Sequence, residues 1–453
     1  MNENIFDKLD FGPLRPLLDN DDITDISYCN GGQIWIRSLS QGSLRVEVPG
    51  CTPEFMEKLA FQCSNVMGTT FNNAKPFLDA ESSELRLNFV HQSIATNGIA
   101  CVIRKTPAKI RLKKEKLLAE DYFTADIHDL LMKCVEGHCN IIVSGETGSG
   151  KTEFVKYLAS HTKESEKIIT IEDTLELHLD KIFPTRDIVA MKTNNVASYT
   201  DVLVTCMRQN PKWILLSEVR SAEAVTAVRN SISSGHNILS TIHADKASAI
   251  PYRLYSLLET DIDVNQFLNT IYRYVQIGVH IKAYYSKEYG KFHREVDEVV
   301  EFYVDNDNNP ISHTIYRKLY GMDPIMTRPS EHLIEYLENQ NIDVNSITGH
   351  LSTEDVEDII AENEKQKHEL ENNQANPIND TNVNNTNDVI NSIDGNIQNS
   401  NSVNNEVNLV NVSPINETNT INSSTFNTTI DHSYNSMSIN SNPINPINGG
   451  GVM

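Results

Sequence analysis

Eight consecutive residues carry the strongest chemical signal in this chain. They complete the pattern G-x-x-x-x-G-K-[ST], in which glycines let backbone N–H groups surround phosphate oxygens. The predicted phosphate-binding residues are Gly145, Glu146, Thr147, Gly148, Ser149, Gly150, Lys151 and Thr152. In such a loop Lys151 would reach the β- and γ-phosphates of a nucleotide, and the Thr152 hydroxyl would ligate Mg²⁺. The motif therefore predicts a site for a nucleotide with its magnesium ion.

The segments on either side of this loop have the patterns that phosphate binding needs. Residues 140–144 are mostly apolar and predict a short buried strand, and residues 153–160 repeat apolar side chains at helical spacing. A strand, a glycine-rich loop and a helix in this order place the positive end of the helix dipole at the phosphates. We therefore predict a nucleotide-binding loop rather than an ordinary glycine-rich turn.

Three acidic residues stand where predicted strands end further along the chain. Glu172 and Asp173 come at the end of residues 167–172, and Glu218 follows the apolar run 213–217. Carboxylates at these strand ends would lie near the loop, so we predict that they hold Mg²⁺ together with Thr152. Glu218 is the predicted catalytic residue that orients the hydrolytic water, and Glu172 would assist it. Alternatively, Asp173 caps the following turn.

Histidines and arginines complete the predicted site. His236 and His243 bracket the predicted strand 237–242, and His243 would sense the γ-phosphate, although a structural role is equally compatible with the spacing. Arginines would stabilise the negative charge that builds up on the γ-phosphoryl group during transfer. The candidate arginines are Arg86 and Arg104 before the loop and Arg208 and Arg220 after it.

The order of the predicted elements divides the chain into five parts. Residues 1–104 predict a small α+β domain, and residues 105–120 a basic, proline-containing linker. Residues 121–305 alternate strands and helices as α/β domains with a parallel sheet do. Residues 306–370 predict a mixed, partly helical extension with helices at 330–339 and 353–370. Residues 371–453 form an Asn-rich tail whose composition is typical of disorder.

Charge and hydrophobicity narrow the class of protein. The net charge of -23, from 38 basic and 61 acidic residues, argues against a protein that coats nucleic acid. No apolar run approaches the roughly 20 residues that span a bilayer, and the first residues lack the pattern of a secretory signal. The seven cysteines include no C-x-x-C pair. We therefore expect a soluble, cytoplasmic protein with reduced thiols.

The motifs occur in an order that resembles the type II/IV secretion ATPase superfamily. Residues 145–152 are similar to its Walker A motif, 171–176 to its Asp box, 215–220 to its Walker B motif and 235–244 to its His box. The run from Leu14 and the strand that closes at Lys105 look most like the VirB11/CpaF (TadA) branch. The spacing of the two histidines is that of GspE and PilT relatives.

This resemblance implies a fold and a function. The fold would be a RecA-like P-loop NTPase domain preceded by a PAS-like α+β domain, assembled as a homo-hexamer that uses ATP and Mg²⁺. Glu218 would be the catalytic glutamate and Glu172 a further essential acid, while Arg86 and Arg104 would reach the phosphates. The ring would dock on inner-membrane platform proteins, at the inner face of the cytoplasmic membrane, and power type IV secretion, conjugation or a Tad-like pilus, without binding nucleic acid directly.

The same residues are also compatible with other functions. A type II secretion motor or a motor of pilus extension or retraction is compatible with the same motifs. The basic linker would suit a RecA-like nucleic-acid motor. Ser217, where the family usually has glycine, and Lys212, where it often has aspartate, would suit a nucleotide-gated scaffold that does not hydrolyse ATP.

Overall fold

The computed structural model describes residues 9–194, 196–258, 262–319 and 323–347. Contacts divide the chain into two compact units, Met1–Pro377 and Ile378–Met453, and every described residue belongs to the first. The helix expected at 353–370 and the Asn-rich tail lie outside the described residues. The five-part division of the chain therefore stays a prediction.

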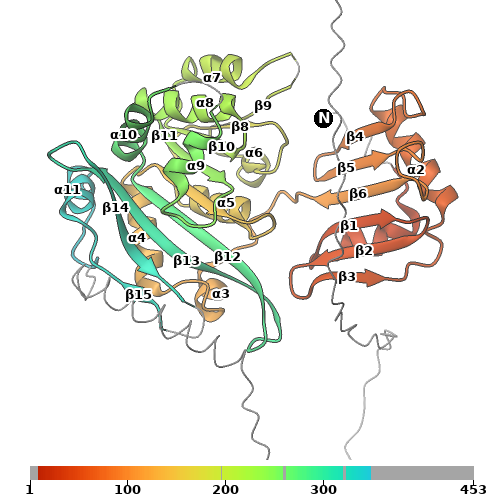
Figure 1. The fold of residues 1–453 in the computed structure, drawn as a ribbon, viewed down its shortest axis with the longest axis horizontal. Helices are drawn as coiled ribbons and strands as arrows, with labels where there is room; N and C mark the ends of the chain where they lie inside the picture. The colour runs from red at the N-terminus through yellow and green to blue at the C-terminus, as the bar shows by residue number, and fades with distance from the viewer. Residues whose placement is uncertain (1–8, 195, 259–261, 320–322, 348–453) are drawn as a thin grey trace, which may run out of the picture. The chain divides into compact units, whose positions relative to one another are not determined.

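The N-terminal part is a six-stranded antiparallel sheet in the order β3-β2-β1-β6-β5-β4 (Figure 1). Its strands are β1 (Ile23–Cys29), β2 (Gln33–Ser38), β3 (Gly42–Val46), β4 (Phe77–Glu81), β5 (Leu85–Val90) and β6 (Ala100–Lys105). The short η2 (Gly12–Leu14) and α1 (Arg15–Asp19) precede it, and α2 (Pro53–Val66) follows β3. The Thr52 side chain accepts a hydrogen bond from the Phe55 N–H and so caps α2. The sequence predicted most of these elements but not β3 or β4.

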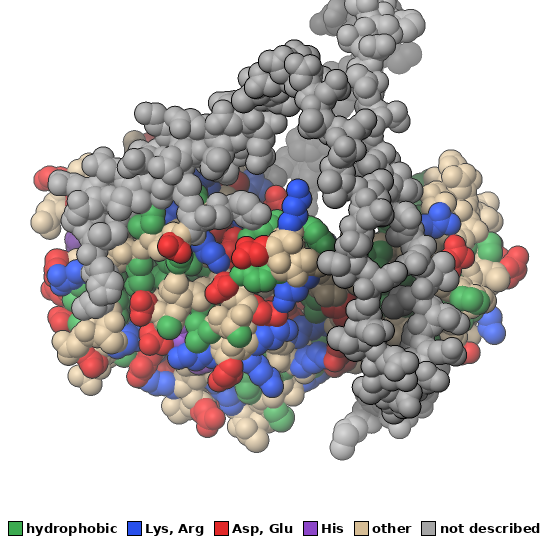
Figure 2. Space-filling model, turned by 90° about the horizontal axis from the view of Figure 1, so that it is seen from below, with side chains coloured by type: hydrophobic (Ala, Val, Ile, Leu, Met, Phe, Trp, Pro, Cys, Tyr) green, Lys and Arg blue, Asp and Glu red, His purple; other side chains and the backbone are tan. Residues whose placement is uncertain are grey.

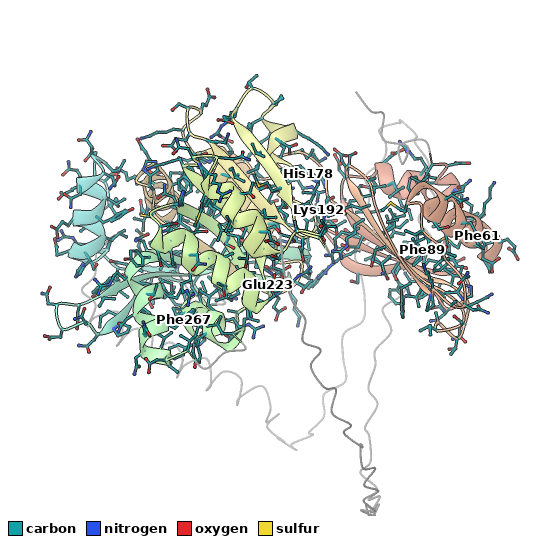
Figure 3. All side chains as sticks on the ribbon, turned by 90° about the horizontal axis from the view of Figure 1, so that it is seen from above. Phe61, Phe89, His178, Lys192, Glu223 and Phe267 are labelled. Carbon is teal, nitrogen blue, oxygen red and sulfur yellow. The ribbon has the colours of Figure 1, made fainter. Side chains whose placement is uncertain are left out.

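The two faces of this sheet have different roles. One face joins α2 in a core that includes Phe89, which is fully buried (Figure 3). The other face carries a row of charged side chains, because Arg37 is paired with Asp25, Asp25 with Arg104, and Arg104 with Arg86 across neighbouring strands. Residues paired directly across strands point to the same face. We call Arg37, Asp25, Arg104 and Arg86 the charged row.

The second sheet has nine strands in the order β15-β14-β13-β12-β7-β11-β10-β8-β9. They are β7 (Ile141–Gly145), β8 (Ile168–Glu172), β9 (Ile188–Lys192), β10 (Trp213–Val219), β11 (Asn237–Ile242), β12 (Ile277–Ser286), β13 (Lys291–Val304), β14 (Pro310–Arg317) and β15 (Ile325–Met326). The strands from β12 to β9 in this order are parallel to their neighbours, as expected. Beyond the predicted strands, β12 pairs antiparallel with β13, β13 with β14 and β14 with β15. Long β12 and β13 form a hairpin that the sequence did not reveal.

Helices cover both faces of the parallel strands. Along β7, Ile141 and Val143 belong to a core shared with α4 and α5, whereas Ile142 belongs to a core shared with α7, α8 and α10. Strands buried on both faces read as continuous apolar runs, which is the pattern of residues 140–144. The helices are α3 (Lys114–Ala119), α4 (Ala125–Glu136), α5 (Lys151–Ser160), α6 (Leu179–Ile182), α7 (Tyr199–Met207), α8 (Ala222–Ser233), α9 (Ile250–Ser256), α10 (Val264–Tyr274) and α11 (Glu331–Asn339).

Two further observations concern the predicted linker and the length of the helices. Part of the predicted basic linker is helical, since α3 begins at Lys114. None of the helices in the described ranges combines the length and the apolar character needed to cross a membrane.

Candidate nucleotide site

The phosphate-binding loop connects β7 directly to α5, as the motif requires. Gly145, Gly148 and Gly150 have φ angles of +146°, +81° and +98°, a region that side chains rarely adopt. A Cβ at Gly145 would also collide with the carbonyl oxygen of Ile281 on the adjacent strand β12. The glycines are therefore required by the path of the backbone, and the predicted strand, loop and helix are confirmed.

The Lys151 side chain lies folded against its own loop. Its Nζ donates hydrogen bonds to the carbonyl oxygens of Gly145 and Glu146, each at 2.9 Å. The side chain is buried, and this burial lowers the pKa of the Lys151 ammonium to about 8, although the carboxylate of Glu218 opposes the shift. Nζ also lies 3.5 Å from Nδ1 of His243. The ammonium is thus held at the mouth of the loop, close to two other predicted site residues.

Glu218 and His243 meet next to this lysine. Glu218 lies near the end of β10 and His243 directly follows β11, so adjacent parallel strands bring them together. Oε1 of Glu218 is 2.8 Å from Nε2 of His243. Burial lowers the pKa of the His243 imidazole, the Lys151 ammonium lowers it further, and Glu218 opposes both effects. His236 stands at the opposite end of β11, where its Nδ1 is 2.9 Å from Ser234 Oγ, so the two histidines are separated.

A carboxylate that the sequence did not single out lies beside Thr152. The Thr152 hydroxyl donates to Oε2 of Glu176 at 3.4 Å. Burial raises the pKa of Glu176, and the nearby Arg104 guanidinium opposes that shift. Glu176 follows β8 by four residues and is the last residue of the segment 171–176 that resembles the Asp box, which is the sequence signal that marks it.

Glu172 occupies a different place from the one predicted. Its side chain is fully buried, and its Oε2 accepts hydrogen bonds from the backbone N–H groups of Glu176 at 2.8 Å and Leu177 at 3.1 Å. The Thr170 hydroxyl donates to Oε1 at 3.0 Å. Burial raises the pKa of Glu172 to about 7. Glu172 therefore holds the backbone that presents Glu176, and it does not line the cavity described next.

A cavity of about 190 Å³ opens over the loop, and half of the predicted site residues line it. Its lining from the phosphate-loop side is Thr147, Gly148, Gly150, Lys151, Thr152, Glu153, Lys156, Glu176, Glu218, Thr241 and His243. Further lining comes from Thr24, Asp25, Arg37, Leu39, Arg104, Lys105, Thr106, Arg111 and Arg294. Basic side chains are thus concentrated around the predicted phosphate-binding loop.

Three arginines contact the loop or stand over it. Arg37 donates to the carbonyl oxygen of Thr147 at 3.2 Å. Arg294 of β13 donates through Nη1 to the Leu39 carbonyl oxygen at 3.0 Å and through Nε to that of Gly148 at 3.4 Å. Arg104 is held by Asp25, with 2.9 Å between Nε and Oδ1. The sequence identified Arg104 but missed Arg37 and Arg294.

The other predicted arginines lie outside the lining. Arg86 is paired with Arg104 in the charged row. Arg220 forms an ion pair with Asp173 and lies 4.0 Å from Oε2 of Glu218. Arg208 is the C-cap residue directly after α7, and the structure does not bring it to the cavity. Asp173 is accordingly engaged by Arg220 rather than placed beside Thr152.

Comparisons with known proteins decide the family. The model of a protein family described as "Type II/IV secretion system protein" matches residues 78–367. The chain belongs to this family. Type IV secretion system protein VirB11 of Brucella suis is 26% identical over 255 residues, which cover 49% of this chain and 69% of the relative. The α/β fold with a RecA-like P-loop domain after a small α+β domain, expected from the resemblance, is confirmed for the described residues.

The chain is also similar to a second sequence relative and to a solved structure. An uncharacterized protein of Bacillus anthracis is 29% identical over 291 residues, so the match covers 64% of this chain and 65% of that protein, less than two thirds of its length. The crystal structure of the VirB11 ATPase of Brucella suis in complex with sulphate aligns at 24% identity over 63% of this chain and 91% of that chain, with a TM-score of 0.34.

Proposed function

We propose that this chain is an Mg²⁺-dependent ATPase that works as a homo-hexameric motor of a type IV secretion, conjugation or Tad-like pilus apparatus. The observation that carries the proposal is the meeting of Lys151, Glu218 and His243 at one phosphate-binding loop, within 2.8 Å and 3.5 Å contacts. A nucleotide-binding loop alone needs Lys151 but neither Glu218 nor His243, whereas hydrolysis needs a group that orients water.

Each residue has a defined task in this proposal. Backbone N–H groups of the loop bind the phosphates, and Lys151 exchanges its two carbonyl partners for phosphate oxygens. Glu218 orients the attacking water and accepts its proton. The hydrogen bond from His243 fixes the Glu218 carboxylate and places a group that responds to the γ-phosphate next to it.

The oxygen donors around Thr152 fit a magnesium ion. Mg²⁺ prefers oxygen ligands and is usually held by one or two protein groups, with phosphate and water oxygens completing the set. The Thr152 hydroxyl and the carboxylates of Glu176 and Glu218 provide such donors. When bound, the ion would neutralise charge on the β- and γ-phosphates.

The arginines would contribute from two directions. Arg104 and Arg37 of the charged row and Arg294 of β13 line the cavity, and their positive charges favour the charge that accumulates on the γ-phosphoryl group. Arg86 would act through its neighbour Arg104. Opening and closing of the cleft against these arginines is the kind of two-state motion that a motor requires.

A second cavity of about 230 Å³ gives space for the rest of the nucleotide. It shares Gly150, Glu153 and Arg294 with the first cavity and adds apolar surface from Leu117, Tyr122 and Phe292, among others. We assign the base and ribose to this space, because a nucleobase needs apolar and aromatic contacts in addition to polar ones.

We propose that the chain assembles as a hexamer at the inner face of the cytoplasmic membrane, where it contacts platform proteins. Its membership of the secretion family supports this assembly and location. A type II secretion or pilus motor is the nearest alternative. A nucleic-acid motor has less support, since Lys109 and Lys114 of the basic linker pair with Asp21 and Asp129, and acidic and basic side chains intermingle on the face drawn in Figure 2.

The proposal is tested by phosphate release from the purified chain with ATP and Mg²⁺. We expect turnover that requires Mg²⁺ and is lost in Lys151→Ala while circular dichroism is unchanged. Lys58→Ala is the matched control, because Lys58 lies on α2, outside the cavity, and its loss should leave turnover intact. Equal turnover in Lys151→Ala and the wild-type protein would refute hydrolysis at this loop. Light scattering with and without ATP tests the hexamer.

A further inference from the structure

The loop that carries His243 is held at both ends by charged side chains. It runs from the end of β11 at Ile242 to the start of α9 at Ile250. At its beginning, Nε of Arg253 donates to the His243 carbonyl oxygen at 2.9 Å. At its other end, Oε2 of Glu298 accepts the Ala247 N–H at 2.5 Å and the Ser248 N–H at 3.3 Å. Glu298 belongs to β13, which none of the nucleotide motifs includes.

Glu298 is buried and fully engaged. Its Oε1 is 3.0 Å from Nη1 of Arg317 on β14 and accepts a hydrogen bond from the Ser248 hydroxyl at 3.4 Å. Only 4% of Glu298 is exposed. A buried carboxylate is stable only when charge and hydrogen bonds compensate it, so its position and that of the loop are fixed together.

A β-bulge directs Glu298 toward this loop. On β12, His280 is paired with Glu298 and Ile281 with Val296, so Asp297 is an extra residue in β13. Nδ1 of His280 is 2.5 Å from Oδ1 of Asp297, which secures the bulge. An extra residue reverses the alternation of side chains beyond it. Val296 accordingly packs in the core with α5, whereas Glu298 and Val300 pass to the other face of the sheet.

We propose that Glu298 is a positioning residue for hydrolysis, which acts by anchoring the loop of His243. This inference rests on the proposed ATPase activity. His243 is 2.8 Å from Glu218, and a displacement of about 1 Å of such a group can reduce turnover about a hundredfold. The carboxylate of Glu298 keeps the imidazole in contact with Glu218 by holding the backbone four and five residues after it.

The variant Glu298→Gln tests the anchor because an amide cannot serve both partners. Its single oxygen can face the loop N–H groups or the Arg317 guanidinium, and its NH₂ group then faces a donor on the other side. Glu301→Gln is the matched control. Glu301 lies on the same strand, is equally buried and accepts hydrogen bonds from the N–H and hydroxyl of Ser330, but it anchors α11 instead.

Two measurements on the full chain decide the proposal. We expect Glu298→Gln to lower kcat about ten- to a hundredfold with KM for ATP within about twofold, and to accelerate amide hydrogen exchange in residues 243–249. Glu301→Gln should change neither, even if both variants lose similar thermal stability. Unchanged exchange at 243–249 in Glu298→Gln would overturn the anchor. Faster exchange with kcat equal to that of Glu301→Gln would overturn the positioning role.

Failure of the proposed function gives a different pattern. If the wild-type protein releases no phosphate, the ATPase proposal and the kinetic role of Glu298 both fall. The exchange measurement would still report whether Glu298 anchors the loop, because it needs no turnover.

Discussion

Two acidic residues lie where adjacent strands of the parallel sheet end, Glu218 on β10 and Glu172 on β8. The Glu218 side chain is 29% exposed and meets His243 at the cavity. The Glu172 side chain is completely buried and turns back onto backbone N–H groups of its own loop. Identical residues at equivalent ends of neighbouring strands therefore serve different purposes. Glu218 faces the cavity over the loop, and Glu172 holds the backbone that carries Glu176.

The largest expected effect follows from removing the charge of Glu218. Glu218→Gln keeps the size of the side chain but can no longer accept a proton from water, so kcat should fall about 10²- to 10⁴-fold. Binding of a fluorescent ATP analogue should persist, because Lys151 and the loop are intact. Stopped-flow binding and phosphate release measure the two quantities separately. If binding of the analogue fell as much as kcat, Glu218 would have a structural role, as Glu172 does, and not a catalytic one.

Truncation of Glu172 should act on stability first. Glu172→Ala leaves the buried N–H groups of Glu176 and Leu177 without acceptors, which costs about 2–4 kcal/mol in the free energy of unfolding. Glu172→Gln is the control, since its oxygen can accept both bonds and its NH₂ group can donate to the Thr170 hydroxyl. Urea denaturation compares the two variants. Equal stability of Glu172→Ala and Glu172→Gln would show that the loop does not need this acceptor.

The raised pKa of Glu172 also predicts a pH dependence. The pKa of about 7 in the folded protein exceeds the ordinary glutamate pKa of 4.5, so protonation favours the folded state. The resulting stabilisation is full below pH 4.5, declines as pH rises and is lost above about pH 7, with an upper limit of about 3 kcal/mol. Denaturation at pH 5 and pH 8 should show this decline in the wild-type protein and a smaller one in Glu172→Gln. Identical profiles would contradict an ionisable Glu172.

The smallest effect is expected at the residue after Glu172. Asp173 pairs with Arg220 at the surface, and such pairs contribute about 0.2–1 kcal/mol. Asp173→Asn should therefore leave the Mg²⁺ concentration for half-maximal turnover within about twofold of the wild-type value. A titration of turnover against Mg²⁺ tests this. A large increase in the Mg²⁺ requirement would restore the metal-ligand role that the sequence suggested.

The sequence was most informative where backbone geometry restricts residue type. The loop could be located because Gly145, Gly148 and Gly150 adopt conformations that other residues avoid. Glu218 and His243 could be placed together because neighbouring parallel strands end at one edge. The position of Glu172 could not be predicted, since spacing does not reveal whether a carboxylate at a strand end turns outward or back onto the chain.

Residues supplied by antiparallel strands were harder to find. Arg294 lies in the β12–β13 hairpin, where no motif marks it and where the strands themselves were not predicted. Arg37 carried a partial signal, because counting from the turn at Asn30 pairs it with Asp25, whereas the pairing of Asp25 with Arg104 is a separate long-range contact. Long-range partners such as Glu298 depend on a bulge, which sequence patterns of period two do not show.

The charged row has a consequence for how the N-terminal sheet can change. Cys101 and Ile103 of β6 are buried in the core shared with α2, whereas Val102 and Arg104 lie on the opposite face of the sheet. A deletion of one residue within β6 would shift the strand register, send Arg104 toward the core and bring an apolar side chain to the face that carries the charged row. Loops of this domain can vary in length without such a penalty. Its strands tolerate only insertions or deletions that leave each side chain on the same face of the sheet.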